Sequence, residues 1–175
     1  KKEASDAVHQ AFLKKLHDIL PSVCRPYIVT DAGFKNPWFQ AVTALGWDYI
    51  GRVRGTVNYN DGSGWQSIKN LFSKVVSNLP KSLGSILLAQ KNSMQTNLYT
   101  YTHKLQGRTK LTKTGAKDQH KDSQTHSRGY REPWLLISSL SSFSAAQRVV
   151  KIYKLRMTIE GSFRDTKSTE FGFSM

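Results

Sequence analysis

The chain has 175 residues, and its 26 Lys and Arg against 12 Asp and Glu give a formal net charge of +14. Such an excess favours a polyanionic partner, above all nucleic acid. A hydrophobic content of 38% excludes a disordered basic tail, and a single cysteine excludes both a disulfide framework and a cysteine-based zinc site. There is no apolar run of ~20 residues and no signal-peptide pattern at the start, so we expect a cytoplasmic protein without a membrane partner.

The first third of the chain predicts alternating helices and strands. Apolar residues at three-and-four spacing predict an amphipathic helix over 4–20. A short apolar stretch predicts a buried strand over 27–31. A second helix is predicted over 37–45, and the segment 47–55 reads as a strand that Gly51 interrupts.

The signals for the second helix are local. Asn36 can cap its start, Pro37 suits the first helical position, and Gly46 suits the residue after its end. These three residues together predict a helix over 37–45.

Residues 56–135 predict mostly β structure, with strand-like stretches at 85–90 and 95–103 and an ambiguous stretch at 66–79. Within this segment, residues 103–131 carry eight Lys or Arg and only two Asp, without apolar periodicity. Such a basic loop either follows DNA phosphates or is a solvated linker, and the sequence does not separate the two.

The strand over 27–31 ends on a carboxylate, Asp31, with Gly33 just behind it. The carboxyl ends of strands are where α/β sheets usually place their chemistry. Aspartate is also a favoured residue in turns and at helix caps, and this structural interpretation is favoured by the stretch on its own.

A long helix is predicted from Ser144 through at least Phe163, with a capping box at its start. Four side chains of different chemistry occupy one ~60° arc of this helix, at 100° per residue. They are Tyr153, Arg156, Glu160 and Lys167. Arginine and lysine bind phosphate and glutamate can ligate a hard cation, so this face suits phosphate chemistry. An ordinary ion pair between Arg156 and Glu160 on a solvated face is the alternative.

The spacing Tyr153-x2-Arg156-x3-Glu160-x6-Lys167, together with the segment IVTDAGFKNPWF around Asp31, resembles the IS-four family of bacterial insertion-sequence transposases. Within that family the chain is most similar to the branch of the tetracycline-resistance composite transposon. The resemblance implies an α/β fold with a ribonuclease H-like core. The core would comprise residues 1–55 and 136–175, interrupted by a β-rich insertion over 56–135.

The resemblance also implies an Asp-Asp-Glu active site with two Mg²⁺ ions, replaceable by Mn²⁺, about 4 Å apart. Asp31 and Glu160 would be metal ligands. Tyr153, Arg156 and Lys167 would hold the DNA near the cleaved phosphate. Trp134 would steady a flipped base while the transposon end forms a hairpin, or it would be a buried tryptophan at the start of a strand.

The family's first catalytic aspartate lies on a strand before the helix matched by residues 4–20, and that strand is absent from this sequence. We therefore expect a fragment without cleavage activity of its own. The implied partners are double-stranded DNA (transposon ends and target) and a second copy in a synaptic homodimer. The alternative function is a non-catalytic DNA-binding remnant of a transposase. A ribonuclease H-like nuclease without transposition is disfavoured by the residues around Glu160.

Overall fold

The computed structural model describes residues 5–75, 78–102, 114, 116 and 132–166. Its strands are β1 (Tyr27–Thr30), β2 (Asp48–Val53), β3 (Asn58–Asn60), β4 (Trp65–Ser67), β5 (Lys81–Leu88), β6 (Met94–Tyr101) and β7 (Trp134–Ser138). Its helices are α1 (Asp6–Ile19), α2 (Asn36–Ala44), the 3-10 helix η2 (Ile68–Lys74) and α4 (Ala145–Thr166). The predicted order of helices and strands is confirmed, and the ambiguous stretch after residue 66 contains β4 and η2.

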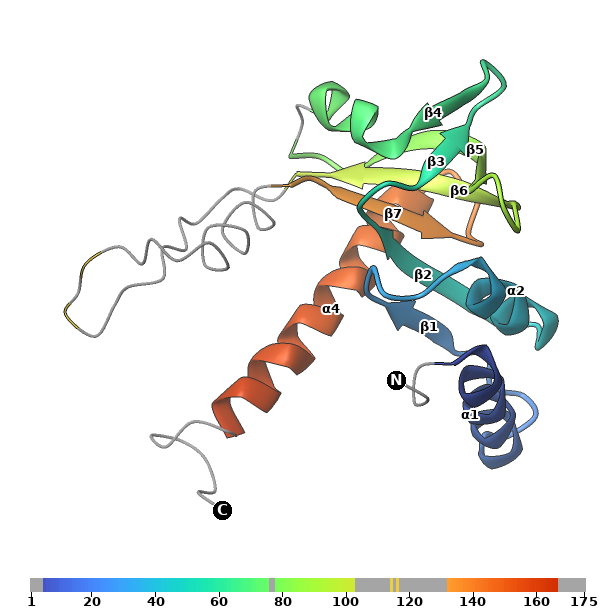
Figure 1. The fold of residues 1–175 in the computed structure, drawn as a ribbon. Helices are drawn as coiled ribbons and strands as arrows, with labels where there is room; N and C mark the ends of the chain where they lie inside the picture. Colours follow the sequence, from blue (N-terminus) through green and yellow to red (C-terminus); the bar gives the residue numbers. More distant parts are fainter. Residues whose placement is uncertain (1–4, 76–77, 103–113, 115, 117–131, 167–175) are drawn as a thin grey trace.

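The strands form a seven-stranded sheet in the order β1-β2-β7-β6-β5-β3-β4 (Figure 1). Strands β1 and β2 are parallel, since helix α2 connects them, and every other pair is antiparallel. The predicted α/β class is confirmed. A mixed sheet with this set of helices is compatible with the ribonuclease H-like core that the resemblance implies.

Strand β7 connects the two halves of the sheet. It pairs with β2 on one side and with β6 on the other. The strands expected in the insertion and those expected in the core therefore share one continuous sheet, and the expected boundary at 135/136 falls inside β7. The division into core and insertion stays a prediction.

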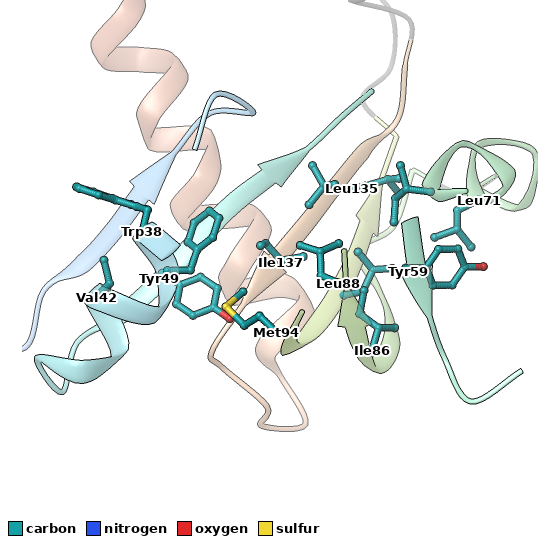
Figure 2. Close-up of a cluster of buried hydrophobic side chains, with 14 of the residues drawn as sticks. Trp38, Val42, Tyr49, Tyr59, Leu71, Ile86, Leu88, Met94, Leu135 and Ile137 are labelled. Carbon is teal, nitrogen blue, oxygen red and sulfur yellow. The ribbon is translucent and has the colours of Figure 1, made fainter. Parts of the chain in front are cut away.

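Hydrophobic side chains cover both faces of the sheet. On one face, residues of α1, α2 and η2 pack against the strands, and Figure 2 shows the buried side chains of this cluster, with α4 behind the sheet. On the other face, α4 packs its first turns against β2, β6 and β7 through Val149, Val150 and Tyr153. In Figure 1 the remainder of α4 extends beyond the sheet, past the end of β1. The carboxyl end of β1 thus lies beside the middle of α4.

Two local predictions are wrong. Asn36 does not cap α2: the cap residue is Lys35, and Asn36 is a buried first helical residue whose amide bonds to another segment. Gly51 does not interrupt its strand but pairs with both neighbouring strands. The glycine is needed because a Cβ atom there would lie 2.4 Å from the ring of Phe39. Gly46 ends α2 at φ +72°, as predicted.

Within the ranges given above, no helix has both the length and the hydrophobicity needed to cross a membrane.

Candidate active site

Asp31 directly follows β1, and its two carboxylate oxygens have different partners. Oδ1 accepts a hydrogen bond from the backbone N–H of Gly33 at 2.9 Å, which forms an Asx turn. Oδ2 lies 3.6 Å from Nη2 of Arg156 on α4. The aspartate therefore shapes the turn, as the structural alternative held, yet leaves one oxygen facing the helix. It does not cap α2, which begins after Lys35.

A second contact joins the same two elements two turns earlier on α4. Arg148 donates from Nη2 to the hydroxyl of Tyr27 at 2.5 Å, and its guanidinium lies 5.2 Å from the centre of that ring. Tyr27 opens β1 and Asp31 follows its end, so the two arginines contact residues at the two ends of the strand. This strand and this helix therefore pack side by side.

Tyr153 shares the helix face of Arg156 but belongs to the core. It is 1% exposed, and Trp134 meets it edge-on with ring centroids 4.9 Å apart. Tyr153 thus packs in the core, although the helix face it shares was expected to suit phosphate chemistry. Arg156, which is 22% exposed, lies where the face leaves the core.

Trp134 is half-buried at the start of β7 and lies among aromatic and cationic side chains. Its second ring neighbour is Tyr101 on β6, at 5.6 Å between centroids. The ammonium of Lys154 lies 4.4 Å from the centre of the Tyr101 ring. Trp134, where the resemblance expects a flipped base, therefore lies beside two aromatic rings, and a cation lies near one of them. The two interpretations of Trp134 both stay open.

Arg52 on β2 was not identified as a site residue from the sequence, although its side chain interacts with Tyr153 of this site. Its side chain hydrogen-bonds to Tyr153. Burial lowers the pKa of Arg52 from its ordinary value, and the nearby Tyr153 opposes this shift. A charged residue in the interior of the strand, between Gly51 and Val53, was the available signal.

Two of the expected site residues have side chains that the structure does not describe. The backbone of Glu160 lies on α4, four residues or about one turn beyond Arg156. Its side chain, the whole of Lys167 and nearly all of the basic loop 103–131 lie outside the described residues.

The donor chemistry at the end of β1 suits a hard cation. The carboxylate of Asp31 is 54% exposed and already attracts a guanidinium, and carboxylate oxygens are the ligands that Mg²⁺ prefers. Among the described side chains, no three from His, Cys, Asp and Glu gather to form a metal site. Asp31 is therefore the described carboxylate that could ligate a metal ion at this end of β1.

The sequence matches the family model for the transposase DDE domain over residues 1–175. No curated protein matches it. Transposases of this family act on DNA and use divalent metal ions, which agrees with the basic composition and with a cation-attracting carboxylate at a strand end. The chain therefore belongs to the transposase DDE domain family.

Proposed function

We propose that this protein is an IS-four family transposase, of the branch found in the tetracycline-resistance composite transposon, and that it acts in cut-and-paste transposition. The observation that carries the proposal is the contact between Asp31 and Arg156. A strand-end carboxylate and the signature arginine are far apart in the chain, and folding brings them to one edge of the sheet.

Asp31 and Glu160 would hold the divalent ions, two Mg²⁺ for which Mn²⁺ can substitute. When bound, such ions activate the attacking oxygen and stabilise the leaving oxygen of a phosphoryl transfer. Arg156 and Lys167 would bind phosphates beside the carboxylates, since both side chains carry a permanent charge at neutral pH. The buried Tyr153 would hold the side chains of Trp134 and Arg52 in position.

The DNA steps follow from this assignment. The transposon end would be nicked, its free 3′-OH would attack the opposite strand to form a hairpin, and the reopened end would join the target. Trp134 would hold the base that leaves the stack at the hairpin. The other partners would be the second copy of a synaptic homodimer and, in the bacterial cytoplasm, the nucleoid DNA.

The test is cleavage of DNA that carries the transposon end by the protein expressed with its upstream codons. Asp31→Asn and Glu160→Gln should each abolish cleavage, because each removes an anionic ligand. Both variants should still bind the DNA, since neither removes a cation. Arg148→Gln is the matched control on α4 and should cleave normally, because Arg148 contacts Tyr27 and no carboxylate among the described side chains.

Residues 1–175 are expected to bind DNA. Binding by this chain should weaken steeply with salt, because cation–phosphate contacts release counterions. DNA binding without cleavage by every form of the protein would support the non-catalytic remnant. A salt-independent affinity would contradict both functions.

A further inference from the structure

A pocket with a volume of about 220 Å³ opens beside the loop that follows Asp31. This volume is well over ten times the roughly 10–15 Å³ that one water needs. The start of α2, the end of β2 and the turn between β5 and β6 form its walls. Apolar walls come from Phe34, Val53 and Ala89, and its polar groups include Lys35, Asn36 and Lys91.

Asn36 is the best-ordered polar group in the pocket. It is 6% exposed, and its side-chain Nδ2 donates to the backbone carbonyls of Leu88 at 2.8 Å and Asn92 at 2.7 Å. Two carbonyl acceptors can only be satisfied by the NH₂ group, so the orientation of the amide is determined. No described residue donates a hydrogen bond to the other atom, Oδ1. Oδ1 is not one of the fully buried polar atoms that lack a partner, so it is accessible, and solvent or a ligand can supply its donor.

Two of the cations that line this pocket, Lys35 and Lys91, are exposed to solvent. Lys35 and Lys91 make no ion pair with any residue the structure describes, and none of the residues that line the pocket is acidic. The two other lining cations already have partners. Arg52 interacts with Tyr153, and Arg54 donates from Nε and Nη2 to Oε2 of Glu132, each at 2.8 Å. The two lysines are therefore the cations available for a phosphate.

The turn that carries Lys91 is held in one shape. Ala89 and Asn92 have positive φ values of 62° and 54°, which side chains other than glycine rarely adopt. The backbone N–H of Ala89 donates to the carbonyl of Asn58 on β3, and the carbonyl of Asn92 accepts from Asn36. These bonds preorganise the wall opposite α2, which lowers the cost of ordering it around a ligand.

We propose that this pocket binds one nucleotide. An N–H of its base donates to Oδ1 of Asn36, the ring lies between the apolar walls, and the phosphate pairs with Lys35 and Lys91. The nucleotide comes either from an unpaired position of bound DNA or from free mononucleotide. The pocket requires no metal chemistry, and only its DNA source rests on the proposed function.

Nucleotide binding is measured by titration of thymidine monophosphate, its N3-methyl derivative, deoxyribose 5-phosphate and inorganic phosphate. Thymine has one N–H donor, so methylation at N3 removes the group that Asn36 would accept from. We expect thymidine monophosphate to bind roughly tenfold more tightly than each of the others. Equal affinity for nucleotide and inorganic phosphate would overturn the proposal.

The charge requirement is tested with the double variant Lys35→Gln/Lys91→Gln. Both side chains are exposed, so folding should be unaffected. The matched control is Lys69→Gln/Lys81→Gln, which removes two exposed charges outside the pocket. The pocket variant should lose roughly tenfold in affinity for the nucleotide and the control should lose little. Equal losses in the two variants would overturn the proposal.

The source of the nucleotide is determined from the changes in amide NMR chemical shift at residues 35–36 and 88–92 when each ligand is added. Shifts with mononucleotide and with a single-stranded oligonucleotide support a general nucleotide site, and shifts with the oligonucleotide alone support the DNA source. If neither ligand changes the chemical shifts of these residues, the proposal that this pocket binds a nucleotide is overturned. Cleavage of transposon ends is measured separately, so failure of the pocket leaves the proposed transposase activity intact.

Discussion

Nη2 of Arg156 lies 3.6 Å from Oδ2 of Asp31, and this ion pair joins the last third of the chain to the end of β1. The carboxylate is 54% exposed and the arginine 22% exposed, so the pair adds little to stability after solvent screening. Its importance is its position. A cation already lies at the oxygen that a divalent metal would use, and the two must compete for it.

Removal of this competitor should strengthen metal binding. We expect Arg156→Met to raise the affinity for Mn²⁺ roughly fivefold, because a unit charge at about 4 Å in water contributes ~1 kcal/mol. Paramagnetic resonance of free Mn²⁺ measures this without any catalysis. Arg148→Met is the control, since it removes the same charge from α4 beside Tyr27. An equal gain in both variants would mean a general charge effect rather than competition at Asp31.

Trp134→Ala should slow hairpin formation more than first-strand nicking, in a form of the protein that cleaves transposon ends. Only the hairpin step requires a base held outside the stack, and base–aromatic stacking contributes ~1–3 kcal/mol. Gel analysis of nicked and hairpin products separates the two rates. Trp134→Phe keeps a ring near Tyr101 and Tyr153 and should retain part of the hairpin rate. Equal loss at both steps would make Trp134 a packing residue.

Tyr153→Phe should destabilise the fold by about 1–3 kcal/mol, since it leaves the half-buried side chain of Arg52 without its hydrogen bond to Tyr153. Urea denaturation measures the change in the free energy of unfolding. Tyr27→Phe is the matched control. It removes the hydroxyl that accepts from the partly solvated Arg148 and should cost below ~0.5 kcal/mol. A loss at Tyr153 no larger than that at Tyr27 would contradict a structural role for its hydroxyl.

Gly51→Ala should destabilise the protein by about 1–3 kcal/mol or more, because the new methyl group would overlap the ring of Phe39. Thermal unfolding monitored by circular dichroism measures the loss. The double variant Gly51→Ala/Phe39→Leu should lose less than the two single variants added together, because the smaller side chain makes room for the methyl group. Strict additivity would show that the clash relaxes elsewhere.

Local patterns were sufficient to predict most of the elements. The three-and-four spacing placed α1 and α4, and Pro37 and Gly46 bracketed α2, because these signals depend on neighbours within a few residues. The same local logic failed at Asn36 and Gly51. Asn36 bonds to Leu88 and Gly51 lies against Phe39, and only folding brings these residues together.

The candidate site divides in the same way. Net charge, the strand-end position of Asp31 and the signature spacing on α4 are properties of the sequence, and they sufficed to predict a transposase with a DDE domain. The tertiary structure decided that Tyr153 is buried, that Arg52 is its partner and that Arg156 meets Asp31. Helical periodicity tells which side chains share a face, but whether that face meets a sheet or solvent depends on long-range packing.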